Sequence, residues 1–320
     1  MKPHPAEAPT QQESQTHDRR PEPRGSRSRL EHRSHGSAGA AGTRPRGRRA
    51  PTLLIWAGAL VAAAIVVVAL LFQAHGGRWF IVETPSMGTT APVGTLVLTT
   101  PVKAQDLHVG DIITFHPPTD AKEVYTHRIV GITAQGIQTR GDINGASDGW
   151  FLHQQDIIGQ TTTILPAVGW LVKGLPILIV GFAFIMFTTS LIRTPTRRQS
   201  FRILGFSMLM SLTVYILRPF VGLVVLTTTP VKAGVEAQVV STGILPITAT
   251  ATHGTSVNLV AGQVGTVTVP AQAGIGHYSM SSALHLSLPE WIAFFAICAI
   301  PLLWTFVVGL PGASDDGDDA

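Results

Sequence analysis

The chain has 320 residues, of which 45% are hydrophobic and 13% are charged, so membrane segments are favoured over one large soluble core. Basic residues are concentrated in residues 1–50. This uneven distribution of a net charge of +4 suits membrane orientation better than a nucleic-acid-binding face. The single cysteine, Cys298, excludes an intramolecular disulfide.

Residues 1–51 are rich in Pro, Arg, Ser, Gly and Ala and almost free of large apolar side chains. Such a segment buries too little surface to offset its chain entropy, so we predict a disordered basic tail. Arg44, Arg46, Arg48 and Arg49 stand directly before the first apolar run and indicate a cytoplasmic flank. Binding of nucleic acid or of specific lipids is the alternative role for these arginines.

Residues 52–73 form an uncharged apolar run that is long enough to cross a bilayer, which needs about 20 helical residues. A cleavable signal peptide has a shorter apolar core and a shorter basic start. We therefore predict an uncleaved transmembrane helix, with its basic side in the cytoplasm and residue 74 onward outside.

Residues 74–174 contain short runs of Val, Ile and Thr that are broken by Gly and Pro, a pattern typical of an all-β domain. About 100 residues can form one core, so we expect a single β-rich extracytoplasmic domain here. The predicted strands cover residues 95–100, 111–115, 126–133, 136–139 and 157–164.

Two further apolar runs, at residues 175–192 and 203–226, predict transmembrane helices 2 and 3. The arginine-rich residues 193–202 between them fit a short cytoplasmic loop. Arg218 interrupts the third run, and its side chain either snorkels to the outer surface or contacts another helix or a partner.

Residues 227–289 are almost uncharged and rich in Thr, Val, Gly and Ala, and we expect a second extracytoplasmic β-rich region, either a small β module or an ordered loop. Strands are predicted at residues 257–260 and 265–269. Residues 290–310 predict transmembrane helix 4, and residues 311–320 form an acidic cytoplasmic tail. The fold class is thus a membrane protein with about four transmembrane helices and a mainly β extracytoplasmic domain.

A serine and a histidine in the predicted extracytoplasmic domain, residues 74–174, suggest acyl-transfer chemistry. Ser86 lies between Pro85, which restricts the backbone before it, and Gly88, which permits a close loop approach. His127 shares a predicted strand face with apolar neighbours and can accept a proton from a serine hydroxyl. Taken singly, Ser86 also fits an ordinary turn and His127 a structural strand histidine.

Two aspartates complete the candidate site. Asp142 and Asp148 flank a Gly/Asn turn, so both can return toward one strand end, one holding the imidazole and the other bracing the loop. Turn chemistry and calcium binding are alternatives, but the glutamate that closes an EF-hand loop is missing. The spacing of His108, His116, His127 and His153 matches no common zinc signature, so we predict neither a metal nor a cofactor.

In combination, these blocks resemble type I signal peptidases, specifically the Ser–His branch found in archaea, in the endoplasmic reticulum and in some Gram-positive bacteria. The resemblance covers roughly residues 81–169. Four blocks carry it: Ser86-Met87, Gly110-Asp111-Ile112-Ile113, Thr126-His127-Arg128-Ile129-Val130, and the stretch from Gly141-Asp142 to Asp148.

The resemblance implies a membrane serine endopeptidase that removes signal peptides from exported precursors after small residues, at Ala-x-Ala sites. Ser86 would attack the scissile carbonyl, His127 would act as base and then acid, and Asp148 would be the likelier partner of His127, with Asp142 supporting the site. The backbone N–H of Ser86 and the hydroxyl of Thr84 would serve the oxyanion. Met87 would pack near the membrane-facing edge.

The resemblance also implies a signal-peptidase-like β fold and a cell-membrane location, with signal peptides and the bilayer as partners. One departure concerns the loop after Ser86, where the family's Ser-Met-x-Pro is replaced and the next proline is Pro92. Helices 2–4 and residues 227–289 exceed a minimal member and could recruit substrates or a membrane partner. The alternatives are an inactive relative that binds or presents exported proteins, and a small transporter or channel component, for which Arg218 is the only supporting residue.

Overall fold

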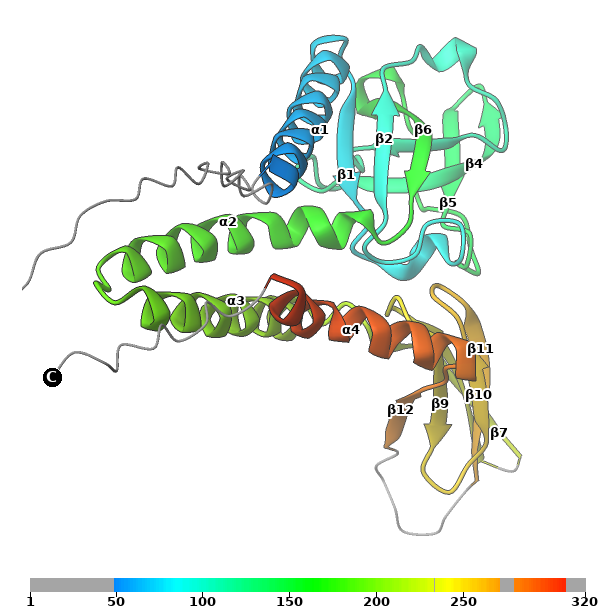
Figure 1. Cartoon of the computed structure of the whole chain (residues 1–320). Helices are drawn as coiled ribbons and strands as arrows, with labels where there is room; N and C mark the ends of the chain where they lie inside the picture. Colours follow the sequence, from blue (N-terminus) through cyan, green and yellow to red (C-terminus); the bar gives the residue numbers. More distant parts are fainter. Residues whose placement is uncertain (1–48, 233, 271–278, 309–320) are drawn as a thin grey trace, which may run out of the picture. The chain divides into compact units, whose positions relative to one another are not determined.

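The computed structural model describes residues 49–232, 234–270 and 279–308 (Figure 1). Within these ranges the chain forms helix α1, strands β1–β6, helices α2 and α3, strands β7–β12 and helix α4, in that order. The predicted N-terminal tail, except for residues 49–51, and the predicted C-terminal tail lie outside the described residues.

Helix α1 (Arg49–Ala74) contains the first predicted span and ends in a defined cap. The N–H of Gly76 donates to Gln73 O over 3.0 Å, and the N–H of Gly77 donates to Phe72 O over 2.9 Å. Gly76 has a φ of +81°, which a residue without a Cβ adopts at little cost. This Schellman motif turns the chain directly from the apolar helix into strand β1.

Residues 78–165 contain a six-stranded antiparallel sheet with the order β1-β2-β6-β3-β4-β5. Its strands are β1 (Arg78–Ile81), β2 (Leu96–Thr100), β3 (Ile112–Phe115), β4 (Tyr125–Thr133), β5 (Gly136–Arg140) and β6 (Ile157–Leu165). The five strands predicted from Val, Ile and Thr runs are confirmed. Strand β1 was not predicted, because its four residues, Arg-Trp-Phe-Ile, show no alternation of apolar and polar positions.

Two apolar clusters form the core of this sheet. One contains seven buried residues, namely Leu107, Ile113, Phe115, Ile129, Ile137, Leu152 and Ile157. The other contains Val82, Met87, Ala91 and Val97. Met87 is only 1% exposed, and its flexible side chain packs in this second cluster. Its expected place near the membrane-facing edge stays a prediction.

Three helices in the described ranges are long and apolar enough to span a membrane: residues Trp56–Ala74 of α1, α2 (Val168–Ser190) and α3 (Pro195–Leu217). Helix α4 (Leu288–Val308) covers most of the fourth predicted span, whose residues 309 and 310 lie outside the described ranges.

The boundaries of helices α2 and α3 differ from those expected for residues 175–192 and 203–226. Helix α2 begins at Val168, and α3 begins at Pro195, so residues 195–202 of the expected loop are helical. Proline favours the first helical position, since it lacks an N–H that would be unpaired there, and arginine sustains a helix beyond its apolar part.

Helix α3 ends earlier than the hydropathy of the sequence indicates. Arg218 adopts a left-handed conformation with a φ of 48°, and the following Pro219 cannot continue the helix. The Arg218 guanidinium lies 5.6 Å from the ring centroid of Tyr215 on the same helix. Residues 223–225 pair with β8, and Leu226 lies at a register shift in the same strand. Apolar Val and Leu side chains suit either a helix or a strand.

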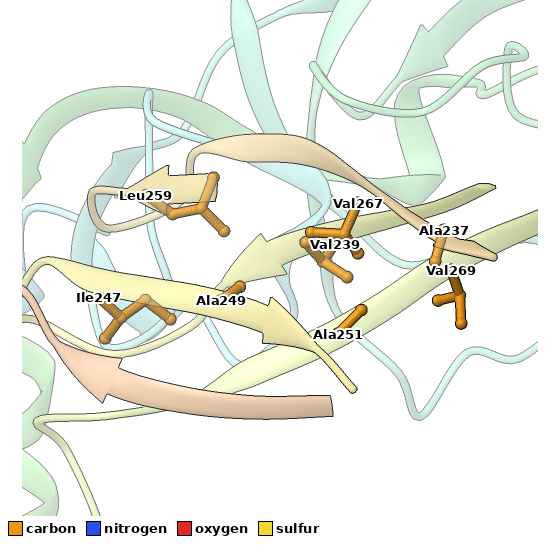
Figure 2. Close-up of a cluster of buried hydrophobic side chains, with 8 residues drawn as sticks. All are labelled: Ala237, Val239, Ile247, Ala249, Ala251, Leu259, Val267 and Val269. Carbon is orange, nitrogen blue, oxygen red and sulfur yellow. The ribbon is translucent and has the colours of Figure 1, made fainter. Parts of the chain in front are cut away.

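The second β-rich region is a β module with its own core. Its strands are β7 (Leu223–Val231), β8 (Gly234–Ser241), β9 (Ile247–Ala251), β10 (Ser256–Leu259), β11 (Val264–Pro270) and β12 (Met280–Leu284). They form two three-stranded sheets, β11-β8-β7 and β10-β9-β12. Figure 2 shows side chains from four of these strands gathered in one cluster, including Val239, Ile247, Leu259 and Val267, each at most 1% exposed. This burial explains why an almost uncharged segment is folded rather than a loop.

Candidate active site

Ser86 lies in a tight turn between β1 and β2. Residues Pro85–Met87 form one turn of 3₁₀ helix, closed by a 2.8 Å hydrogen bond from the N–H of Gly88 to Pro85 O. Gly88 has a φ of +54°, and a Cβ at this position would lie 2.5 Å from Cγ2 of Ile143. Glycine is therefore required here, both for the backbone conformation and for the close approach of the loop that carries Ile143.

His127 projects from β4 toward Ser86. Its Nε2 lies 3.1 Å from Ser86 Oγ, which is hydrogen-bonding distance. The imidazole stacks on Tyr125, with ring centroids 5.7 Å apart, and meets the edge of Phe115 at 6.1 Å. Since the His127 residue is only 7% exposed, this aromatic packing holds the ring in one orientation.

Asp148 lies on the other side of the imidazole. Its Oδ2 is 2.8 Å from His127 Nδ1, and both side chains are 8% exposed. A carboxylate accepts from Nδ1–H and so leaves Nε2 as the proton acceptor that faces Ser86. The Thr139 hydroxyl also donates to Asp148 Oδ2 over 2.6 Å, and the Asp148 N–H donates to Thr139 O over 2.8 Å.

Asp142 makes different contacts. Arg128 donates to both of its carboxylate oxygens over 2.8 Å, through Nε and Nη2, and Thr90 donates to Oδ2 over 2.6 Å. Arg128 Nη1 also donates to Gly110 O over 2.9 Å. The Arg128–Asp142 pair therefore ties β4 to the loops that carry Thr90 and Gly110, and Asp142 does not hold the imidazole.

The environment of Asp142 stabilises its charged form. Burial on its own raises the pKa of this carboxyl, but the hydrogen bonds from Arg128 and Thr90 and the charge of Arg128 outweigh that effect. The pKa of Asp142 consequently lies below its ordinary value. The hydrogen bond to Asp142 in turn raises the pKa of Arg128.

The loop that follows β5 closes on the backbone of the Ser86 turn. The N–H of Ile143 donates to Ser86 O over 3.0 Å. A Cβ at Gly141 would lie 2.7 Å from Ser86 O and 2.9 Å from Ser86 Cβ. These contacts explain the Gly141-Asp142 pair. Glycine at position 141 leaves room for the Ser86 turn, and Asp142 beside it bonds to Arg128.

Residues 53–146 match the family model described as signal peptidase, peptidase S26. This match covers less than a third of the chain and supports the type I signal peptidase family. The matched residues include Ser86, His127 and Asp142, and they end just before Asp148. No curated protein matches the chain.

Thr84 lies next to the serine of this signal peptidase domain. Its Oγ1 is 3.4 Å from Ser86 Oγ, and Thr84 is exposed. The contacts of Thr90 and Thr139 were not anticipated from the sequence. Thr139 is buried at an inward position of β5, but neither threonine belongs to a motif that singles it out.

The histidines weighed as zinc ligands are not gathered in the peptidase domain. Across the described residues, no group of three or more His, Cys, Asp or Glu side chains is arranged to hold a metal ion. His116 Nδ1 bonds to Glu123 O at 2.7 Å, while His108 and His153 lie near Asp111 and Asp156 in their own turns.

Proposed function

We propose that this protein is a membrane-bound signal peptidase I, a serine endopeptidase that removes signal peptides from exported precursors. The observation that supports this most is the continuous chain Ser86 Oγ–His127 Nε2–Nδ1–Asp148 Oδ2, with distances of 3.1 and 2.8 Å. Ser86 and His127 lie within the residues that match the S26 family. These are the groups and contacts that serine acyl transfer needs.

In the proposed mechanism, Ser86 Oγ attacks the scissile carbonyl while His127 Nε2 takes its proton. Asp148 accepts from Nδ1–H and stabilises the resulting imidazolium. His127 then protonates the leaving amine, the new N-terminus of the mature protein. Water, activated by the same imidazole, hydrolyses the acyl enzyme and restores the Ser86 hydroxyl.

The developing oxyanion requires donors beside the nucleophile. We assign this role to the backbone N–H of Ser86 and the hydroxyl of Thr84, which already lies 3.4 Å from Ser86 Oγ. Asp142 is a positioning residue, because its bonds to Arg128 and Thr90 brace the loops around the serine turn.

The membrane spans fit this substrate class. A signal peptide has its apolar segment in the bilayer, so its cleavage site lies near the surface, and tethering the enzyme there raises the effective concentration. We infer four spans, a cytoplasmic N-terminus and both β regions on the extracytoplasmic side, since arginines precede α1 and follow α2. An extended substrate with small residues at alternate positions would add to a strand edge.

The test is cleavage of a precursor with an Ala-x-Ala site by the purified full-length protein in lipid. The parent is expected to cut after the second alanine, and Ser86→Ala and His127→Ala are each expected to reduce the rate by at least about 10³-fold. Ser147→Ala and His108→Ala are matched controls, because both residues are exposed and lie outside the proposed triad.

Parental activity in Ser86→Ala or His127→Ala would disprove the role of that residue. If the parent cut neither this precursor nor a precursor encoded with it, an inactive relative that binds exported proteins would become the better explanation.

A further inference from the structure

A cavity of about 570 Å³ lies beside the six-stranded sheet, near the junction of helix α1 and strand β1. None of the proposed triad residues lines it. Its lining includes Gly76, Arg78 and Phe80 at the start of the sheet, and His116, Val124 and Ile158 from β3, β4 and β6 or their ends. This volume lies within the range of small-ligand sites in proteins.

The cavity faces away from His127. Phe115 and Tyr125 are paired across β3 and β4 and both contact the imidazole of His127. Their chain neighbours His116 and Val124 line the cavity, and successive side chains of an extended strand point to opposite faces. The lining of the cavity includes none of the proposed triad residues Ser86, His127 and Asp148.

The cavity combines positive charge with an apolar wall. Arg78 and His116 line it, together with Phe80, Val124 and Ile158, and no acidic side chain does. No ion pair joins Arg78 to an acidic side chain in the described part of the chain. An arginine in this setting favours a phosphate group, to which its guanidinium donates in a fork.

His116 adds a second polar group. Its Nδ1 donates to the carbonyl of Glu123 over 2.7 Å, which leaves Nε2 for a ligand. Nε2 accepts from a hydroxyl when the imidazole is neutral and donates to a phosphate oxygen when it is protonated.

The position in the chain indicates where such a ligand comes from. Gly76 belongs to the Schellman motif that ends α1 at Ala74, and Arg78 is the first residue of β1. Residues Trp56–Ala74 are apolar enough to span a membrane, so the cavity begins at headgroup depth. Trp79, beside Arg78, is 42% exposed, as is typical of side chains at a membrane interface.

We propose that this cavity binds the headgroup of an anionic glycerophospholipid from the leaflet on the side of the peptidase domain. Arg78 holds the phosphate, His116 contacts a hydroxyl of the headgroup, and Phe80, Val124 and Ile158 cover the glycerol and the first acyl carbons. This site is independent of the proposed peptidase activity.

The experiment measures phosphatidylglycerol bound to the delipidated full-length protein in detergent, by native mass spectrometry. Arginines near the α2–α3 turn, such as Arg193 and Arg197, also attract anionic lipid, so the readout is the difference between variants. Arg78→Gln is expected to weaken the affinity for phosphatidylglycerol at this site by at least about tenfold. The spectrum of this variant should therefore show one bound lipid fewer than that of the parent. His116→Gln is expected to weaken it less, and Arg78→Lys is expected to retain part of the binding.

Arg140→Gln is the matched control, because Arg140 is an exposed arginine on β5, at the opposite edge of the sheet from β1. Equal binding by the parent and Arg78→Gln would overturn the proposal, as would equal losses in Arg78→Gln and Arg140→Gln. Phosphatidylcholine is expected to bind more weakly at this site. If inorganic phosphate displaced phosphatidylglycerol at concentrations similar to those of the lipid, the site would be a free-phosphate site, and the proposal would be overturned. Thermal unfolding of each variant checks that the fold is intact.

Discussion

At the residue scale, Asp142 and Asp148 have separate roles even though one short turn joins them. Asp148 accepts from His127 and Thr139, and both side chains of the His127–Asp148 pair are almost fully buried. Asp142 pairs with Arg128 and remains partly open to solvent, with 21% of its side chain exposed. A change at Asp142 should therefore act mainly on stability, whereas a change at Asp148 should act on the imidazole.

We expect Asp142→Asn to lower the free energy of unfolding by about 1–2 kcal/mol at pH 7, because it removes a charge-assisted pair of hydrogen bonds. The pKa of Asp142 is below its ordinary value in the folded protein, so the charged carboxyl stabilises the fold above the unfolded pKa of about 3.9. This stabilisation is lost as the pH falls through the folded pKa. The measurement is thermal unfolding of parent and variant in detergent across pH 3 to 8.

The difference in melting temperature should thus be largest near neutral pH and shrink below about pH 4. Asp106→Asn serves as a control, since Asp106 is an exposed aspartate in a separate turn. A difference that stayed constant across the whole pH range would contradict the role given to the Asp142 charge.

At the element scale, the six-stranded sheet depends on close approaches between neighbouring strands. Strand β6 lies between β2 and β3, and its register with each of them shifts at a bulge. Gly159 lies at this crowded place: a Cβ there would be 2.2 Å from the backbone oxygen of Thr100. A backbone atom cannot rotate away as a side chain can, so the strands themselves would have to separate.

Gly159→Ala is expected to destabilise the protein by about 1–3 kcal/mol, the usual cost of overpacking a tight site. Gly131→Ala on β4 is the matched control, because the nearest atom to its new Cβ is the flexible Gln138 amide oxygen at 3.7 Å. That control should be neutral or slightly stabilising, since alanine reduces the entropy of the unfolded chain. Equal melting temperatures for the two variants would show that the β2–β6 contact is not a constraint on the sheet.

At the scale of the whole molecule, the proposed topology places two β regions on one side of the membrane and the α2–α3 turn on the other. Each β region has its own apolar core, so each can fold after its segment has been exported. In this proposed topology, the arginines near the α2–α3 turn would keep that turn in the cytoplasm.

This topology predicts which single cysteines react with a membrane-impermeant thiol reagent in a Cys298→Ser background. Ala134→Cys and Ser256→Cys, both at exposed positions of the two β regions, should be labelled in intact cells. Thr194→Cys, at the exposed start of α3, should be labelled only after the membrane is opened. Labelling of Thr194→Cys in intact cells would reverse the assignment of the α2–α3 turn.

Some features followed from the sequence alone because they depend on local composition. Long uncharged apolar runs indicate membrane helices whatever the tertiary contacts of the chain. Runs of Val, Ile and Thr between Gly and Pro predicted five strands of the first sheet. The candidates Ser86 and His127 came from residue type and order together with the resemblance, since acyl transfer needs a nucleophile and a base.

Other features were decided only by the tertiary structure, because they depend on contacts between segments far apart in the chain. The sequence left open which aspartate faces the imidazole, and the distance of 2.8 Å between Asp148 and His127 depends on how β4 and β5 pair. Strand β1 forms because β2 pairs with it, and residues 223–225 become strand because β8 pairs with them. An apolar segment suits a helix or a strand equally well, and its neighbours in space select between them.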